Sequence, residues 1–221
     1  MKKEIITKIN NFWRNPQTKK YFWGDWLDVR YYLCDRLSEF KNKKILDISC
    51  QTGVVIKCLD RSNQIYGIDI DADSINICKQ ENPNANLIIG DIFSQNFDKE
   101  SFDIIILAHV LPSHDYQSQH KPEELIQLCL KWLKPDGYLF VTTPNGENPY
   151  FKKKNKITIE NLKKIFSGFN YKILEWNPFP IQAQKILRYT PQIFEFLKYD
   201  MQNKKDVKKS ISFYVVATKT S

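Results

Sequence analysis

The stretch ILDISCQTG at residues 45–53 carries the strongest fold signal in the sequence, and the apolar run VVIKCL follows it at residues 54–59. Its β-branched residues and the lysines before it favour a buried strand over residues 44–49. We expect a turn and the start of a helix near Thr52 and Gly53. A strand, a turn and a helix N-terminus in this order gather unpaired backbone N–H groups, which attract polar or anionic ligand groups. The stretch therefore predicts a nucleotide-type binding site.

Further apolar runs follow, separated by segments with helical patterns. Strands are expected at residues 64–70, 87–92, 102–109, 137–145, 171–176 and 211–218, with helices after residue 70 and at 121–133 and 158–167. Strands that alternate with helices predict an α/β fold with a parallel sheet wound on both sides.

Two of these strands end in acids. Asp69 closes the second strand roughly 20 residues after Asp47, where a Rossmann-like fold holds the ribose hydroxyls of its ligand. A carboxylate only accepts hydrogen bonds, so it can take both hydroxyl protons of a diol. Asp91 ends the third strand in the same way. The alternatives are a surface acid at a strand end for Asp69 and an ordinary Gly-Asp turn for Asp91.

Five motifs in this order resemble the class I S-adenosylmethionine-dependent methyltransferases: ILDISCQTG, YGIDID, IIGDIF, FDIIILAHVL and LKPDGYLFVTTPN. The resemblance covers residues 44–145 well and 158–176 loosely, and it is greatest to the small-molecule branch related to quinone-biosynthesis O-methyltransferases. It implies a Rossmann-like, doubly wound, mostly parallel seven-stranded sheet with helices on both faces and an antiparallel last strand. It also implies S-adenosyl-L-methionine as the cofactor and a small-molecule acceptor, methylated at oxygen.

The resemblance further implies which residues hold the cofactor. Asp47 supports the loop and approaches the amino end of the cofactor, although capping a turn would also explain this acid. Asp69 holds the ribose, and Asp91 receives the adenine amino group. The other implied positions are Arg30 (methionine carboxylate, or a solvated helix arginine), Ser49, Gln51, Gly53, Ile70, Ile92 against the adenine ring, and Ala108 over the methyl donor.

Ser49, Gln51 and Gly53 occupy the positions where this family usually has Gly-x-Gly-x-Gly. Glycine serves there because a side chain blocks the approach of the backbone or disfavours a positive φ. Ser49 is small, whereas Gln51 departs most from the pattern. This departure is the main support for an alternative function, a non-catalytic methyltransferase-like binding or adaptor protein.

All three histidines of the chain lie within residues 109–120. His109 and His114 are candidates for the general base that a hydroxyl acceptor needs. A metal site is a weaker alternative because the spacing matches no known ligand signature, so no metal is expected. His120 is expected to be an exposed loop residue.

The 221 residues fit one methyltransferase domain over 1–221. Within it we expect an N-terminal helical cap (1–43), the cofactor-binding core (44–145) and a C-terminal part (146–221). The C-terminal part carries an insertion at 177–210, which is expected to cap the substrate pocket or to add core packing.

Composition limits the class of protein. The sequence contains no run of 18 apolar residues, so no membrane span is expected. No long apolar stretch follows the first lysines, so we expect no signal peptide in these residues. Five cysteines without a Cys-x-x-Cys pair are typical of a reduced, cytoplasmic protein. The net charge of +8 permits an RNA methyltransferase as a further alternative, so nucleic acid is possible but not favoured as a partner. The sequence does not indicate an oligomeric state.

Overall fold

The computed structural model describes residues 4, 7–9, 11, 33–111, 120–148, 157–167, 171–180 and 210–219. The described residues form two compact units, one ending at Ser94 and one beginning at Gln95, and each is described by itself. The predicted single domain over 1–221 stays a prediction. Of the predicted N-terminal cap, the short helix α3 (Cys34–Leu37) is described, and its Cys34 and Leu37 are buried.

Three parallel strands form the sheet of the first unit: β1 (Lys44–Ile48), β2 (Gln64–Asp69) and β3 (Asn86–Ile89), in the order β3-β2-β1. Ile48 pairs with Ile68, and Asp69 pairs with Ile89. The carboxyl ends of the three strands are therefore level, and the loops that follow them meet at one edge of this sheet. A 3-10 turn, η3 (Ile92–Ser94), follows β3.

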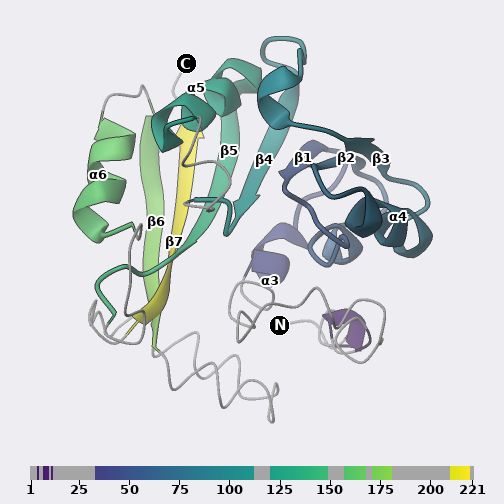
Figure 1. Ribbon diagram of the computed structural model, residues 1–221, viewed down its shortest axis with the longest axis horizontal. Helices are drawn as coiled ribbons and strands as arrows, with labels where there is room; N and C mark the ends of the chain where they lie inside the picture. The colour runs from purple at the N-terminus through teal and green to yellow at the C-terminus, as the bar shows by residue number, and fades with distance from the viewer. Residues whose placement is uncertain are drawn as a thin grey trace. The chain divides into compact units, whose positions relative to one another are not determined.

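Helix α4 (Ala72–Glu81) follows β2 and packs beside β2 and β3 (Figure 1). Asp71 caps its first turn, because the Asp71 side chain accepts a hydrogen bond from the backbone N–H of Asp73. Ile75 and Cys78 of this helix pack in a buried cluster with Cys50 and Ile56. The cluster holds the helix against the loop that follows β1.

The predicted helix start near Thr52 and Gly53 is wrong. The run after Gly53 forms one 3-10 turn, η2 (Ile56–Cys58). The Asp60 side chain then accepts hydrogen bonds from the backbone and the hydroxyl of Ser62, which turns the chain toward β2. The loop after β1 is therefore not followed directly by the N-terminus of an α-helix.

Four strands form the sheet of the second unit, in the order β4-β5-β7-β6: β4 (Phe102–Ala108), β5 (Leu133–Pro144), β6 (Tyr171–Pro180) and β7 (Ser210–Lys219). β4 and β5 are parallel, and β7 is antiparallel to both β5 and β6. Helix α5 (Pro122–Trp132) packs against β5 and against α6 (Ile159–Ser167). The α/β class, the mostly parallel strands and the antiparallel last strand are confirmed.

The start of the predicted insertion at residue 177 is too early. Residues 177–180 continue β6, where Asn177 pairs with Tyr214 and Pro180 pairs with Ser210. Ser210 already belongs to β7. The rest of the predicted insertion, 181–209, lies outside the described residues. None of the described helices is both long and apolar enough to cross a membrane.

Candidate cofactor site

The side chain of Asp69 joins two segments at the edge of the first sheet. Its Oδ2 accepts a hydrogen bond from the backbone N–H of Gln51, and its Oδ1 accepts one from that of Asp71, both at 2.9 Å. The carbonyl oxygen of Asp69 also accepts the N–H of Gly90, at 2.9 Å. Asp69 is buried, and each carboxylate oxygen keeps a second lone pair, so the carboxylate can still accept hydroxyl protons.

The loop after β1 has the backbone conformation that glycine favours, although two of its three glycine positions carry other residues. Ser49, Gln51 and Gly53 have φ values of 56°, 47° and 80°. The left-handed region is uncommon for residues other than glycine. The side chain of Gln51 is exposed. The two substitutions therefore leave the loop conformation in place, and Gln51 does not fill the loop with its side chain.

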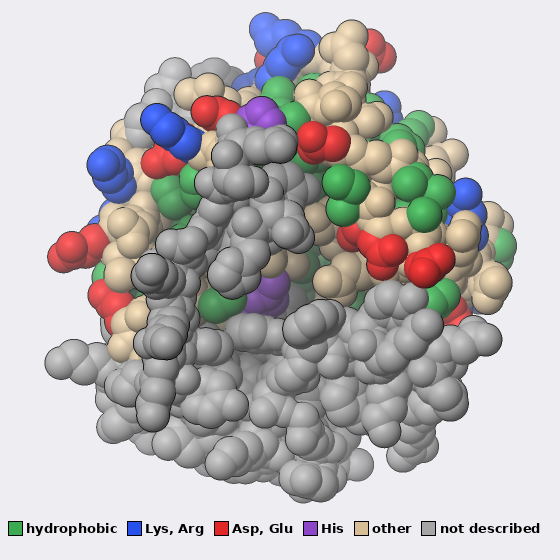
Figure 2. All heavy atoms as spheres, in the orientation of Figure 1, with side chains coloured by type: hydrophobic (Ala, Val, Ile, Leu, Met, Phe, Trp, Pro, Cys, Tyr) green, Lys and Arg blue, Asp and Glu red, His purple; other side chains and the backbone are tan. Residues whose placement is uncertain are grey.

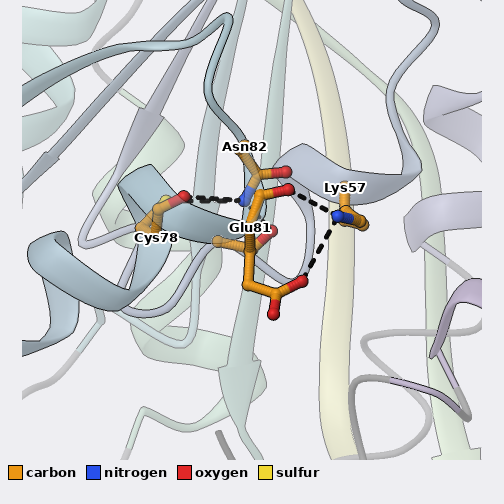
Figure 3. Close-up of polar contacts among 5 residues, drawn as sticks. Lys57, Cys78, Glu81 and Asn82 are labelled. Carbon is orange, nitrogen blue, oxygen red and sulfur yellow. Dashed lines mark hydrogen bonds and ion pairs between the residues drawn. The ribbon is translucent and has the colours of Figure 1, made fainter.

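The end of α4 supports this loop at Gly53. The side-chain amide of Asn82 donates hydrogen bonds to the carbonyl oxygens of Gly53 and Cys78, both at 3.3 Å. A Cβ atom on Gly53 would overlap Sγ of Cys78 and lie 2.5 Å from Nδ2 of Asn82. Figure 3 shows the neighbouring Glu81 turned toward Lys57, whose Nζ contacts the Glu81 carboxylate at 3.3 Å. Glycine is therefore required at position 53 by contact as well as by conformation.

Asp47 has an unusual environment for a carboxyl group. It is 1% exposed, and among the described residues neither of its oxygens has a hydrogen-bond partner. Burial, and then the nearby charge of Asp69, raise the pKa of Asp47 to about 8. A buried carboxyl group without a donor suits a ligand that brings a cationic group or an N–H donor.

The third loop places Asp91 beside this edge of the sheet. Oδ1 of Asp91 accepts the backbone N–H of Phe93 at 3.0 Å. Asp91 therefore stabilises a local turn, which was the alternative role considered for it in the sequence. Ile92 is buried, and its predicted contact with adenine stays a prediction. Ile70 and Ile89 are the exposed large hydrophobic residues of the described chain, at 72% and 48%. Ile89 was not singled out in the sequence, where its place before Gly90 was the available signal.

His109 and Ala108 lie in the second unit, at the carboxyl end of β4. The backbone N–H of His109 donates to the carbonyl oxygen of Thr142 at 2.9 Å and to its Oγ1 at 3.2 Å. His109 has a φ of 59°, which is uncommon for a residue with a side chain and is often seen at functional sites. Thr142, on β5, was missed in the sequence because it lies far from His109 along the chain.

Two predicted site residues, Arg30 and His114, lie outside the described residues. His120 precedes α5, and its Nδ1 lies 2.9 Å from the carboxylate of Glu124 on that helix. It is half-buried where the sequence predicted an exposed loop residue, and it serves a local contact. Within the described ranges, no group of three or more His, Cys, Asp or Glu side chains could hold a metal ion.

Comparison with known proteins shows which families and folds this chain is similar to. Residues 46–141 match the family described as a methyltransferase domain. The ubiquinone biosynthesis O-methyltransferase of Glaesserella parasuis is 30% identical over 159 residues, which cover 64% of this chain and 63% of the relative. The phosphoethanolamine N-methyltransferase of Plasmodium falciparum is 27% identical over 189 residues, which cover 78% of this chain and 67% of the relative.

A solved structure supports the same fold. The SAM-dependent methyltransferase from Archaeoglobus fulgidus has a TM-score of 0.59 at 17% identity, over 87% of this chain and 92% of that one. The described fold is therefore similar to that of this solved methyltransferase. Residues 46–141 are similar in sequence to methyltransferase domains, as the motifs predict. The chain spans about 63% of the length of the Glaesserella relative.

Proposed function

We propose that this protein transfers a methyl group from S-adenosyl-L-methionine to a hydroxyl oxygen of a small molecule. The observation that carries the proposal is the bond between the Gln51 N–H and the Asp69 carboxylate. It holds a loop with left-handed φ at Ser49, Gln51 and Gly53, which is the backbone form expected of a cofactor loop.

The residues at this edge of the first sheet fit the cofactor chemically. Asp69 retains lone pairs for the two ribose hydroxyls, and Asp91 is an acceptor for the adenine amino group. The buried carboxyl group of Asp47, which has no donor among the described residues, suits the positively charged amino group of the cofactor. When bound, the cofactor supplies a methyl group on a positively charged sulfur. The nucleophile attacks the methyl carbon in line, and the sulfur is the leaving group. The protein's part is to bind, orient and exclude water.

The proposal assigns the general base to His109. A hydroxyl acceptor becomes a better nucleophile as its proton leaves, and an imidazole has the pKa for this task near neutral pH. The left-handed backbone of His109, held by two bonds to Thr142, supports a functional role for this residue. Oxygen is preferred as the acceptor atom because a relative at 30% identity is named as an O-methyltransferase. A relative at 27% identity is named for an amine acceptor, so both chemistries belong in the test.

The adaptor and RNA alternatives have less support. The adaptor function rested on Ser49 and Gln51, which adopt the conformation that glycine would take. An RNA methyltransferase requires a continuous basic surface beside the cofactor. On the face drawn in Figure 2, the Lys and Arg side chains of the described residues form separate groups and not one continuous patch.

Calorimetry with S-adenosylhomocysteine tests cofactor binding. We expect a Kd in the micromolar range or tighter for the wild type. Methyl transfer is then followed with labelled S-adenosylmethionine and two acceptor sets, catechol-type hydroxyl compounds and small primary amines, and we expect label on the hydroxyl set. Absence of binding would favour the adaptor, and label on the amines alone would contradict the oxygen assignment.

We also infer that the protein works in a reducing, cytoplasmic compartment. All five cysteines are free and buried, so none of them forms a disulfide. Mass spectrometry of the purified protein without reductant should find five free thiols, and a disulfide would contradict this inference.

A further inference from the structure

Asp47 and Asp69 form a pair of acids with very different hydrogen bonding. Burial raises the pKa of Asp69, and the two backbone N–H groups that it receives at 2.9 Å oppose this by favouring its charged form. Asp47 receives no hydrogen bond from the described residues, and it is 1% exposed. The two carboxyl groups are close enough to repel each other when both are charged. The pair therefore has one member prepared for a negative charge and one that is not.

Among the described residues, the groups that face Asp47 from neighbouring elements do not supply a positive charge. In the described part of the chain, the groups that interact with it electrostatically are Asp69 from β2 and the thiol of Cys50 from the loop after β1. A hydrogen bond with Cys78 of α4, together with burial, raises the pKa of Cys50, so this thiol stays neutral. A proton is then the simplest way to neutralise Asp47, and its pKa of about 8 agrees with this.

We propose that Asp47 exchanges its proton for the positively charged amino group of the bound cofactor, so that binding releases one proton from the protein at neutral pH. The inference rests on the proposed function and adds a selectivity to it. Ligands that carry a positive charge beside the adenosine gain affinity as the pH rises. Neutral adenosine ligands do not, because they give the carboxylate no partner.

The proton count tests this directly. S-adenosylhomocysteine is titrated into the protein at pH 7 in two buffers with different ionisation enthalpies, and the difference in heat gives the number of protons released. We expect close to one proton for the wild type and none for Asp47→Asn, which keeps the shape of the side chain and carries no titrating group. The matched ligand is 5′-methylthioadenosine, which lacks the amino acid part. It should bind to the wild type without releasing a proton.

The pH dependence of affinity provides a second measurement. The Kd of S-adenosylhomocysteine should fall about tenfold between pH 6 and pH 7 and level off above pH 8. Asp91→Asn is the control, because it removes a carboxylate near the site and should weaken binding without changing the proton count.

The outcomes separate this inference from the proposed function. Tight binding of S-adenosylhomocysteine with equal heats in both buffers would overturn the proton exchange and leave the methyltransferase function intact. Proton release that persists in Asp47→Asn would assign the proton to another group and overturn the inference as well. Absence of any binding would remove the proposed function, and the exchange with it.

Discussion

The backbone N–H of Gln51 donates a 2.9 Å hydrogen bond to Oδ2 of Asp69, across 18 positions of the chain. Gln51, which departs most from the family's glycine pattern, is thus held in place by Asp69, an acid at the position where the family pattern has one. The conformation of the loop is fixed by this bond to β2, and Gly53 is the one of its three left-handed positions that is glycine. Asp69 is therefore expected to have two roles, one in holding the loop and one in binding the ribose.

Asp69→Ala should lower stability as well as abolish cofactor binding. The substitution leaves the N–H groups of Gln51 and Asp71 without their charged acceptor, which costs roughly 2–3 kcal/mol, and we expect the variant to remain folded. Urea unfolding and calorimetry with S-adenosylhomocysteine measure the two effects. Unchanged affinity would remove the ribose assignment.

Asp71→Ala is the matched control for this variant. It removes the cap of α4 and should cost about 1 kcal/mol of stability, while the affinity for S-adenosylhomocysteine stays within about twofold. Loss of affinity in this variant too would mean that stability alone explains the behaviour of Asp69→Ala.

Gln51→Gly should stabilise the protein. Gln51 has a φ of 47°, and the left-handed region costs a residue with a Cβ atom about 1 kcal/mol or more, partly offset by the greater freedom of glycine in the unfolded chain. The variant keeps the N–H that bonds to Asp69, so the gain reports the conformation alone. Gln51→Ala is the control, because it shortens the side chain without relieving the backbone. Equal urea midpoints for the two variants would argue against strain at this position.

Much of the first unit could be predicted because its signals are local. The strand ending at Asp69 is followed at once by the Asp71 cap and the helix it begins, so adjacent residues determine the strand, the acid and the helix start. The predicted helix after Gly53 failed because the sequence of residues 54–59 does not reveal that the chain turns again at Asp60.

Other features depend on contacts between distant residues. Proline is disfavoured within a strand, yet Pro178 and Pro180 pair with β7 and extend β6 beyond its predicted end at residue 176. The bond between His109 and Thr142 joins residues 33 positions apart in the chain, and neither residue type alone predicts it. The positive φ values of Ser49 and Gln51 follow from their place in the loop and not from their own preferences.

The stability of the cofactor-free protein should fall as the pH rises through the range set by Asp47. Its pKa is about 8 in the folded protein and about 3.9 when unfolded, so between these values the folded state binds more protons than the unfolded state. Stability is therefore greatest below about pH 4 as far as this group is concerned, and it falls by at most about 1.4 kcal/mol per pH unit until pH 8. The raised pKa of Asp69 acts in the same direction.

Asp47→Asn should flatten this dependence, since its side chain does not titrate. At pH 5, 6.5 and 8, the urea midpoint of Asp47→Asn should rise relative to that of the wild type at each step. The midpoint of Asp91→Asn should change with pH as the wild type does. Parallel curves for wild type and Asp47→Asn would mean that Asp47 is already charged in the free protein.

His109→Asn should slow methyl transfer by about 10²-fold or more while the Kd for S-adenosylhomocysteine changes little, because the side chain is proposed to move a proton and not to hold the cofactor. Asparagine is chosen because it tolerates the left-handed φ of 59°, so the backbone bonds to Thr142 should survive. His109→Ala should lose the same activity and about 1 kcal/mol of stability in addition. Thr142→Val keeps the carbonyl acceptor and the side-chain volume, and should reduce kcat only modestly. Normal turnover in His109→Asn would eliminate His109 as the base, because the one property that the variant lacks is the imidazole.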